Sequence, residues 1–233
     1  RIREIKPYEI SKFLQKTVRD LSMADKTART QLSVINMIMK HGVACGDLEM
    51  NPARDLEVPR HLRHNKREMP SEDDIKAVKA SANATFGLFA YMILYTGCRR
   101  NELLALTWDD IDIENRTISI NKSLYQIAGG QVRVKTPKTQ SGIRELPILD
   151  KLLPYLRPSE GLLFPNPYTG GYISDGAFTA LWNKYKNESG VSCTPHQLRH
   201  AYATMLYEAG VSESDAMELL GHAQISTTRE IYV

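Results

Sequence analysis

The sequence predicts a mainly helical α+β protein, in which a small helical domain precedes a mixed domain of helices around a small antiparallel β-sheet. Three observations lead to this fold class. Apolar residues recur at helical spacing through residues 1–58 and through much of residues 71–233. Segments rich in β-branched residues occur at 117–126, 131–138 and 143–149. A basic stretch that is poor in apolar residues separates the two helical parts.

We expect residues 1–59 to form the small helical domain. In "PYEISKFLQKTVRDL" the apolar residues near one face of a helix are Ile10, Phe13, Leu14 and Leu21. "TARTQLSVINMIMKHGVACG" repeats this pattern with Leu32, Ile35, Ile38 and Met39. The two prolines of "NPARDLEVPRH" then end the segment.

The stretch "RHLRHNKREMP", residues 60–70, is expected to be a basic linker between the two domains. A run of charged residues is often only a solvated connector. Composition alone does not distinguish such a connector from a segment that binds a partner.

Residues 71–233 are expected to form the mixed domain. Ser71 and Asp74 have the spacing of a capping box, which starts a helix. The apolar run 86–95 predicts a buried helix that ends near Gly97. Gly129-Gly130 predicts the first turn of the sheet. A later helix is expected to start at Thr194, Pro195 and Gln197 and to end at Gly210. The next is expected to start at Ser212 and Asp215 and to end at Gly221.

Composition excludes several classes of protein. The longest nearly uninterrupted apolar run has ten residues, too few to span a bilayer, and the N-terminus lacks a signal-peptide pattern. Cys45, Cys98 and Cys193 lack metal-ligand spacing. We therefore expect a reduced cytoplasmic protein with no metal and no membrane partner. A net charge of +3 is compatible with nucleic-acid binding but does not establish it.

Residues that could carry chemistry are spread over the second domain: Arg99, Lys138, His196, Arg199, His222 and Tyr232. Each has a simple structural explanation when taken alone. An arginine just past a helix end, such as Arg99, is a common stabilising placement. Lys138 and Arg144 flank a Ser-Gly turn, as the residues of a polar hairpin tip would.

Taken together, these residue types suit a phosphodiester. Guanidinium groups match the non-bridging oxygens of a phosphate, a lysine can protonate a leaving oxygen, and a tyrosine can act as nucleophile. The sequence has no carboxylate cluster, Gly-rich phosphate loop or nucleophile elbow that would indicate another chemistry.

In these motifs the chain resembles the tyrosine recombinase, or phage integrase, family, in particular integrases of conjugative transposons and prophages. "TGCRRNELLALTWDDID" corresponds to the motif of the first catalytic arginine, with Glu102 as the acidic residue that usually follows. "PKTQSGIRELPI" corresponds to the hairpin lysine motif, "HQLRH" to the His-x-x-Arg box, and "LGH" and "STTREIY" to the last two motifs. All these positions are filled in family order.

The resemblance implies the tyrosine recombinase fold, with a core-binding domain ahead of the catalytic domain. It also implies a role for each residue. Tyr232 would attack the scissile phosphate and form a 3′-phosphotyrosyl link, while Arg99 and Arg199 hold the non-bridging oxygens. Lys138 would protonate the leaving 5′-oxygen. His196 would assist proton transfer, and His222 would hydrogen-bond the phosphate. No metal, ATP or other cofactor would be required.

The implied partner is double-stranded DNA, bound by a homotetramer on two sites that exchanges strands through a Holliday junction. The resemblance further implies that the protein is bacterial or phage-encoded, is associated with the nucleoid, and serves integration or excision of a mobile element. The basic linker would then lie beside the DNA backbone through Arg60, Arg63, Lys66 and Arg67. Because the sequence ends one residue after Tyr232, we expect a monomer or weak association without DNA.

Two alternatives remain open at this point. A type IB topoisomerase nicks and religates a duplex with the same chemistry, and a catalytically silent DNA-binding protein could keep the fold. Relaxation of supercoils without site preference would favour the first. The six filled catalytic positions argue against the second.

Overall fold

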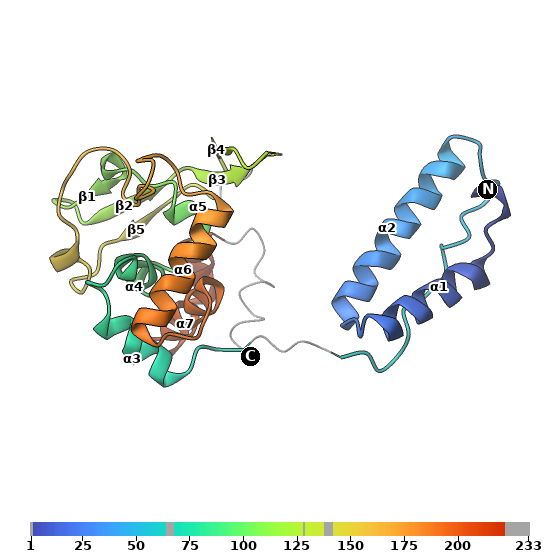
Figure 1. Cartoon of the computed structure of the whole chain (residues 1–233), viewed down its shortest axis with the longest axis horizontal. Coiled ribbons are helices and arrows are strands. Elements are labelled where there is room, and N and C mark those ends of the chain that lie inside the picture. The colour runs from blue at the N-terminus through green and yellow to red at the C-terminus, as the bar shows by residue number, and fades with distance from the viewer. Residues whose placement is uncertain (1, 64–67, 128, 138–141, 222–233) are drawn as a thin grey trace. The chain divides into compact units, whose positions relative to one another are not determined.

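The computed structural model describes residues 2–63, 68–127, 129–137 and 142–221. The chain divides into two compact units, Arg1–Arg67 and Glu68–Val233 (Figure 1). This division falls inside the basic stretch 60–70. No helix in the described ranges is long and apolar enough to cross a membrane.

The first unit is built on two helices, α1 (Pro7–Asp20) and α2 (Asp25–Ala44), after a short 3-10 turn, η1 (Ile2–Glu4). Its buried residues on α1 are four apart, at Ile10, Leu14 and Val18, so a narrow line of the helix contacts α2. Phe13, Leu21 and Ile38, which the sequence placed near the apolar faces, are instead 55, 66 and 54% exposed. Leu21 lies just past the end of α1, as its C-cap residue, and the prediction of a shared apolar face fails for these three residues.

The second unit holds the other helices and all the described strands. Its helices are α3 (Glu72–Ala80), α4 (Gly87–Thr96), α5 (Arg100–Leu103), α6 (Asp175–Ser189), α7 (Pro195–Glu208) and α8 (Glu213–Leu220). Two 3-10 turns, η2 (Trp108–Asp110) and η4 (Leu153–Tyr155), lie between them in sequence. The capping boxes predicted at Ser71 and Thr194 are both present, and Ser212 caps α8.

Helix α4 forms the centre of this unit, as its apolar run predicts. All but one of its ten residues are buried, and it packs against α7. It ends at Gly97, whose φ of 61° is left-handed and whose N–H donates to the carbonyl of Ile93. The ring of Tyr202 on α7 lies directly over Gly97, since a Cβ added there would be 2.2 Å from Tyr202 Cδ1. A glycine is therefore required by both backbone conformation and packing.

The strands form two small antiparallel sheets in the described residues, where the sequence predicted one. β2 (Thr117–Ile120) pairs with β1 (Ile111–Asp112) on one side and with β5 (Arg144–Pro147) on the other. β3 (Ser123–Gln126) and β4 (Val132–Lys135) form a separate hairpin. The strands gather on one side of the unit, and α3, α4 and α7 lie on the other (Figure 1). The α+β fold class is confirmed.

A buried carboxylate ties the start of the second unit to the start of α7. Asp74 on α3 accepts hydrogen bonds from the backbone N–H groups of Ser192, at 2.6 Å, and Cys193, at 3.3 Å. Burial would raise the pKa of Asp74, but hydrogen bonds from Ser192 and Ser71 outweigh this effect and lower it. The segment that leads into the "HQLRH" helix is thus anchored by a charge.

We expect Asp74→Ala to lower the free energy of unfolding by about 1–3 kcal/mol at pH 7, because buried donors lose their acceptor. A carboxylate with a lowered pKa stabilises the fold above its unfolded pKa, about 3.9, and this contribution is lost as the pH falls through the folded pKa. The deficit measured by urea unfolding should therefore shrink below about pH 4. Asp73→Ala is the control, because the Asp73 side chain is 94% exposed on the same turn. Equal effects of the two changes would contradict the anchoring role.

Gly97→Ala tests the packing of α4 on α7. The left-handed backbone alone costs a non-glycine residue about 1–2 kcal/mol, and displacing Tyr202 should add about 1–3 kcal/mol. Gly190→Ala is the matched control: Gly190 ends α6 with a φ of 75°, and a Cβ there would meet nothing within 4 Å. Thermal or urea unfolding should show the larger loss for Gly97→Ala, and equal losses would show that Tyr202 does not constrain this turn.

Candidate active site

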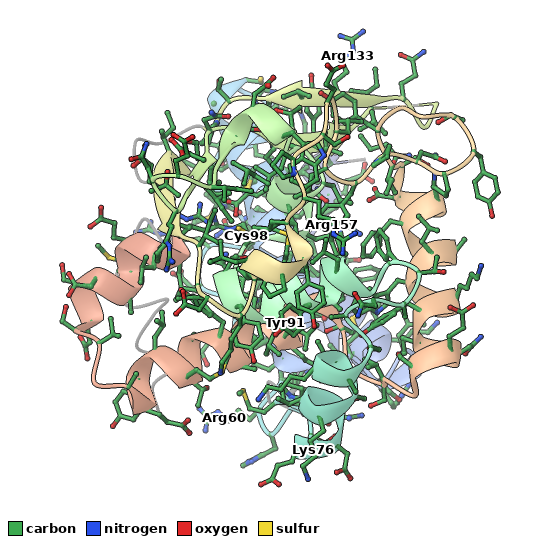
Figure 2. The ribbon with its side chains drawn as sticks, turned by 90° about the vertical axis from the view of Figure 1, so that its left-hand side faces the viewer. Arg60, Lys76, Tyr91, Cys98, Arg133 and Arg157 are labelled. Atoms are coloured by element: carbon green, nitrogen blue, oxygen red, sulfur yellow. The ribbon has the colours of Figure 1, made fainter. Side chains whose placement is uncertain are left out.

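Arg99 is placed by the turn that joins α4 to α5. It is the N-cap residue of α5, and its backbone N–H donates to Glu102 Oε2 at 2.9 Å. Cys98, between Gly97 and Arg99, lies in the interior of the unit (Figure 2). Burial raises the pKa of its thiol, so it is a packing residue here and not a reactive one. The side chain of Arg99 keeps 44% of its surface exposed, so a ligand can reach it.

Glu102 is a buried carboxylate shared by two arginines. Arg99 Nη1 donates to its Oε1 at 2.7 Å, and Arg144 Nη2 donates to its Oε2 at 2.9 Å. A second contact from Arg144, Nη1 to Oε1 at 3.3 Å, makes that pair a two-pronged one. Burial alone would raise the pKa of Glu102, but the hydrogen bonds and charge of Arg144, followed by the charge of Arg99, lower it to about 2. Glu102 is therefore ionised at any physiological pH.

Arg199 on α7 is buried and held by backbone carbonyls. Its Nη1 donates to the carbonyl of Gly97 at 2.6 Å, and its Nη2 donates to that of Leu220 at 2.5 Å. Burial, followed by the charges of Arg99 and Arg144, lowers the pKa of Arg199 to about 9. The guanidinium is still charged at neutral pH. Because its neighbours repel it, an approaching anion would be favoured.

Three guanidinium groups hold three consecutive carbonyls at the end of α8. Arg144 Nε donates to Leu219 at 2.8 Å, Arg199 Nη2 to Leu220, and Arg99 Nη2 to Gly221 at 2.7 Å. The carbonyl end of a helix carries partial negative charge and leaves acceptors without partners inside the helix, so cations stabilise it. Arginines from three distant parts of the sequence thereby meet at one point.

This cluster carries excess positive charge. Three guanidinium groups meet at this helix end, and among the described residues the carboxylate that pairs with them is Glu102, which is bound by Arg99 and Arg144. Carbonyl dipoles offset part of the excess, but a phosphate oxygen at the exposed side of Arg99 would offset more. In the described part of the chain no group of three or more His, Cys, Asp or Glu residues is placed to hold a metal ion. The arrangement suits the binding of an anion by cationic side chains.

His196 lies one turn before His200 on α7, and their Nε2 atoms are 2.9 Å apart. His196 is exposed, whereas His200 is buried. Since one ring must donate and the other accept, the tautomers of the two histidines are coupled. His200 was not among the candidate residues from the sequence, although its spacing of four from His196 is visible there.

The structure brings Arg99 and Arg199 together at the end of α8, and places His196 on the same helix as Arg199. Lys138, His222 and Tyr232 lie outside the described residues, as do Lys66 and Arg67 of the linker. Arg60 and Arg63 are described and exposed in the first unit. Arg144 differs from its sequence interpretation: it is not part of a polar hairpin tip, because its side chain is only 2% exposed.

The phage integrase family profile matches residues 71–233. A XerC-like tyrosine recombinase of Caldanaerobacter subterraneus subsp. tengcongensis is 28% identical over 98% of this chain and 67% of that protein. A putative prophage phiRv2 integrase of Mycobacterium tuberculosis is 24% identical over 82% of this chain and 54% of that protein.

Solved structures of two integrases share the fold. The Tn1549 transposon integrase in complex with a circular intermediate DNA has a TM-score of 0.80 at 20% identity, covering 100% of this chain and 82% of that one. A λ integrase dimer bound to a core site has a TM-score of 0.66 at 16% identity, and the match covers 99% of this chain and 81% of that one. The chain has the tyrosine recombinase fold and belongs to the phage integrase family.

Proposed function

We propose that the chain is a site-specific recombinase that cuts and rejoins double-stranded DNA through a covalent link to Tyr232. The observation that carries the proposal is the meeting of Arg99, Arg144 and Arg199 at the end of α8, with Glu102 paired to the first two. Arg99 and Arg199 are two of the predicted catalytic residues, they belong to elements far apart in the sequence, and they meet at the same helix end.

In the proposed reaction Arg99 and Arg199 bind the non-bridging oxygens of the scissile phosphate. The oxygen of Tyr232 forms a bond to phosphorus as the bond to the 5′-oxygen breaks. His196 assists removal of the phenolic proton, Lys138 supplies a proton to the 5′-oxygen, and His222 hydrogen-bonds the phosphate. Attack by a 5′-hydroxyl of another strand reverses these steps and releases Tyr232.

The local geometry supports the role given to the two arginines. Stabilisation of a transition state is greatest when the charged groups are held in place before reaction. Arg199 is held by two carbonyls, and Arg99 by Glu102 and the Gly221 carbonyl. Neither side chain therefore has to be ordered when the phosphate arrives.

The solved Tn1549 and λ integrases are complexes with DNA, which supports DNA as the partner of this chain. We further propose a homotetramer on two DNA sites, strand exchange through a Holliday junction, and integration or excision of a mobile element as the role. The protein would act in the nucleoid-containing cytoplasm of a bacterium. Residues 1–59 would form the core-binding domain and 71–233 the catalytic domain.

Covalent trapping tests the reaction. A nicked suicide duplex carrying the recombination site, first found by selection from a random-sequence duplex pool, should give a slowly migrating adduct in a denaturing gel. Tyr232→Phe should abolish it. Arg99→Ala and Arg199→Ala should each slow its formation by about 10²–10³-fold, by analogy with loss of an oxyanion donor.

Arg100→Ala is the matched control for Arg99. Arg100 is the adjacent residue, but it pairs with Asp175 at 2.8 Å and stacks on Phe178. Its loss should leave the rate within a few fold. An adduct that survives Tyr232→Phe would mean another nucleophile, and DNA binding without any adduct would identify a catalytically silent DNA-binding protein. Relaxation of plasmids without site preference would indicate the topoisomerase alternative.

The salt dependence of DNA binding tests the linker. Each phosphate contact adds about 0.9 to the slope of log affinity against log salt concentration. Replacing Arg60 and Arg63 by Ala, or Lys66 and Arg67 by Ala, should therefore make the slope shallower by about 1.8 for each pair. Arg116→Ala is the control, because Arg116 is paired with Asp150 at 2.6 Å in the second unit. If neither pair of substitutions changed the slope, the linker would not contact the DNA backbone.

A further inference from the structure

Arg144 links three parts of the second unit through one side chain. It is the first residue of β5, where its backbone pairs with Ile120 of β2. Its guanidinium donates to both oxygens of Glu102 and to the carbonyl of Leu219 at the end of α8. With its side chain 2% exposed, it lies beneath the surface at which a ligand would bind.

The contacts of Arg144 determine how Arg99 can use Glu102. A carboxylate has about four acceptor positions. Here Oε1 accepts from Arg99 Nη1 and Arg144 Nη1, while Oε2 accepts from the Arg99 backbone and Arg144 Nη2. With these positions filled, the Arg99 guanidinium donates to the carboxylate through one nitrogen only. Without Arg144, the buried charge of Glu102 would draw Arg99 into a closer, two-pronged pair.

The same side chain fixes the end of α8. Gly221, whose carbonyl accepts from Arg99, lies two residues after Leu219, whose carbonyl accepts from Arg144. The carboxylate and the helix end that position Arg99 are therefore both held by Arg144. In sequence, Lys138 lies six residues before Arg144, and His222 directly follows Gly221.

We propose that Arg144 is a positioning residue for the phosphoryl transfer: it occupies Glu102 and holds the end of α8, and thereby keeps Arg99 turned toward the phosphate. The proposal rests on the proposed function, because it assumes that Arg99 binds the reacting phosphate. Arg144 itself does not touch the DNA.

The test measures single-turnover adduct formation with saturating enzyme on the suicide duplex. Arg144→Lys keeps the charge but loses the fork, and should slow cleavage by about 10–100-fold, the usual effect of losing a residue that orients a site. The dissociation constant for DNA should stay within about two-fold of the unchanged protein, since a buried residue makes no DNA contact. Arg116→Lys, at the exposed pair with Asp150, is the control and should have no effect on either quantity.

A double-mutant cycle separates positioning from general loss of stability. If Arg144 acts through Arg99, Arg144→Lys should have little further effect in an Arg99→Ala background, because interacting residues are not additive. An equal loss in both backgrounds would overturn the proposal, as would cleavage by Arg144→Lys at the unchanged rate. Failure of the unchanged protein to form any adduct would instead overturn the proposed function.

A second variant applies if thermal melting shows that Arg144→Lys does not fold. Glu102→Gln with Arg144→Met removes both buried charges together, and such replacements are often neutral for stability. This pair should fold and cleave slowly, because Arg99 loses its charged anchor and the end of α8 loses the bond from Arg144. Its deficit should disappear in the Arg99→Ala background. Cleavage at the unchanged rate by the folded pair would overturn the proposal.

Discussion

Glu102 is a carboxylate that the fold removes from water, and its need for positive partners organises the residues around it. Burying one unpaired ion costs several kcal/mol even after relaxation of the protein. The partners are Arg144, which lies 42 residues after Glu102 in the chain, and Arg99, which lies three residues before it. The turn between α4 and α5 and the start of β5 must therefore come together. The turn that carries Arg99 cannot move without exposing or unpairing this charge.

The end of α8 explains how the unit accommodates an excess of buried positive charge. Three arginines lie close together, whereas Glu102 pairs with two of them, Arg99 and Arg144. Burial together with the charges of Arg99 and Arg144 lowers the pKa of Arg199 to about 9. Consecutive carbonyls at Leu219, Leu220 and Gly221 receive one N–H from each guanidinium. These dipoles offset part of the charge but carry no full negative charge themselves. The remaining excess would favour the binding of an anion at this site.

Local signals could be predicted from the sequence, and long-range pairing could not. The capping boxes at Ser71 and Thr194 depend on residues three apart, and the buried helix α4 depends on one apolar run, so both follow from short segments. Phe13, Leu21 and Ile38 fit a helical repeat but are exposed, because which residues of a repeat become buried depends on how the helices pack. The split into two sheets has the same origin, because β5 pairs with β2 across the intervening hairpin. From the sequence alone Arg144 looks like a surface residue, because nothing in the sequence shows that Glu102 and Leu219 are its neighbours.

The anchoring of Arg99 does not use up its capacity to bind a phosphate. A guanidinium carries five N–H donors. Arg99 gives one from Nη1 to Glu102 and one from Nη2 to the carbonyl of Gly221. A phosphate can therefore be bound without breaking either anchoring bond, and the energy of reorganisation is small. A lysine at this position would have a single ammonium to divide among the carboxylate, the carbonyl and the phosphate, and it could not hold a fixed plane. The architecture around Glu102 thus requires an arginine at position 99 for geometric reasons as well as for its charge.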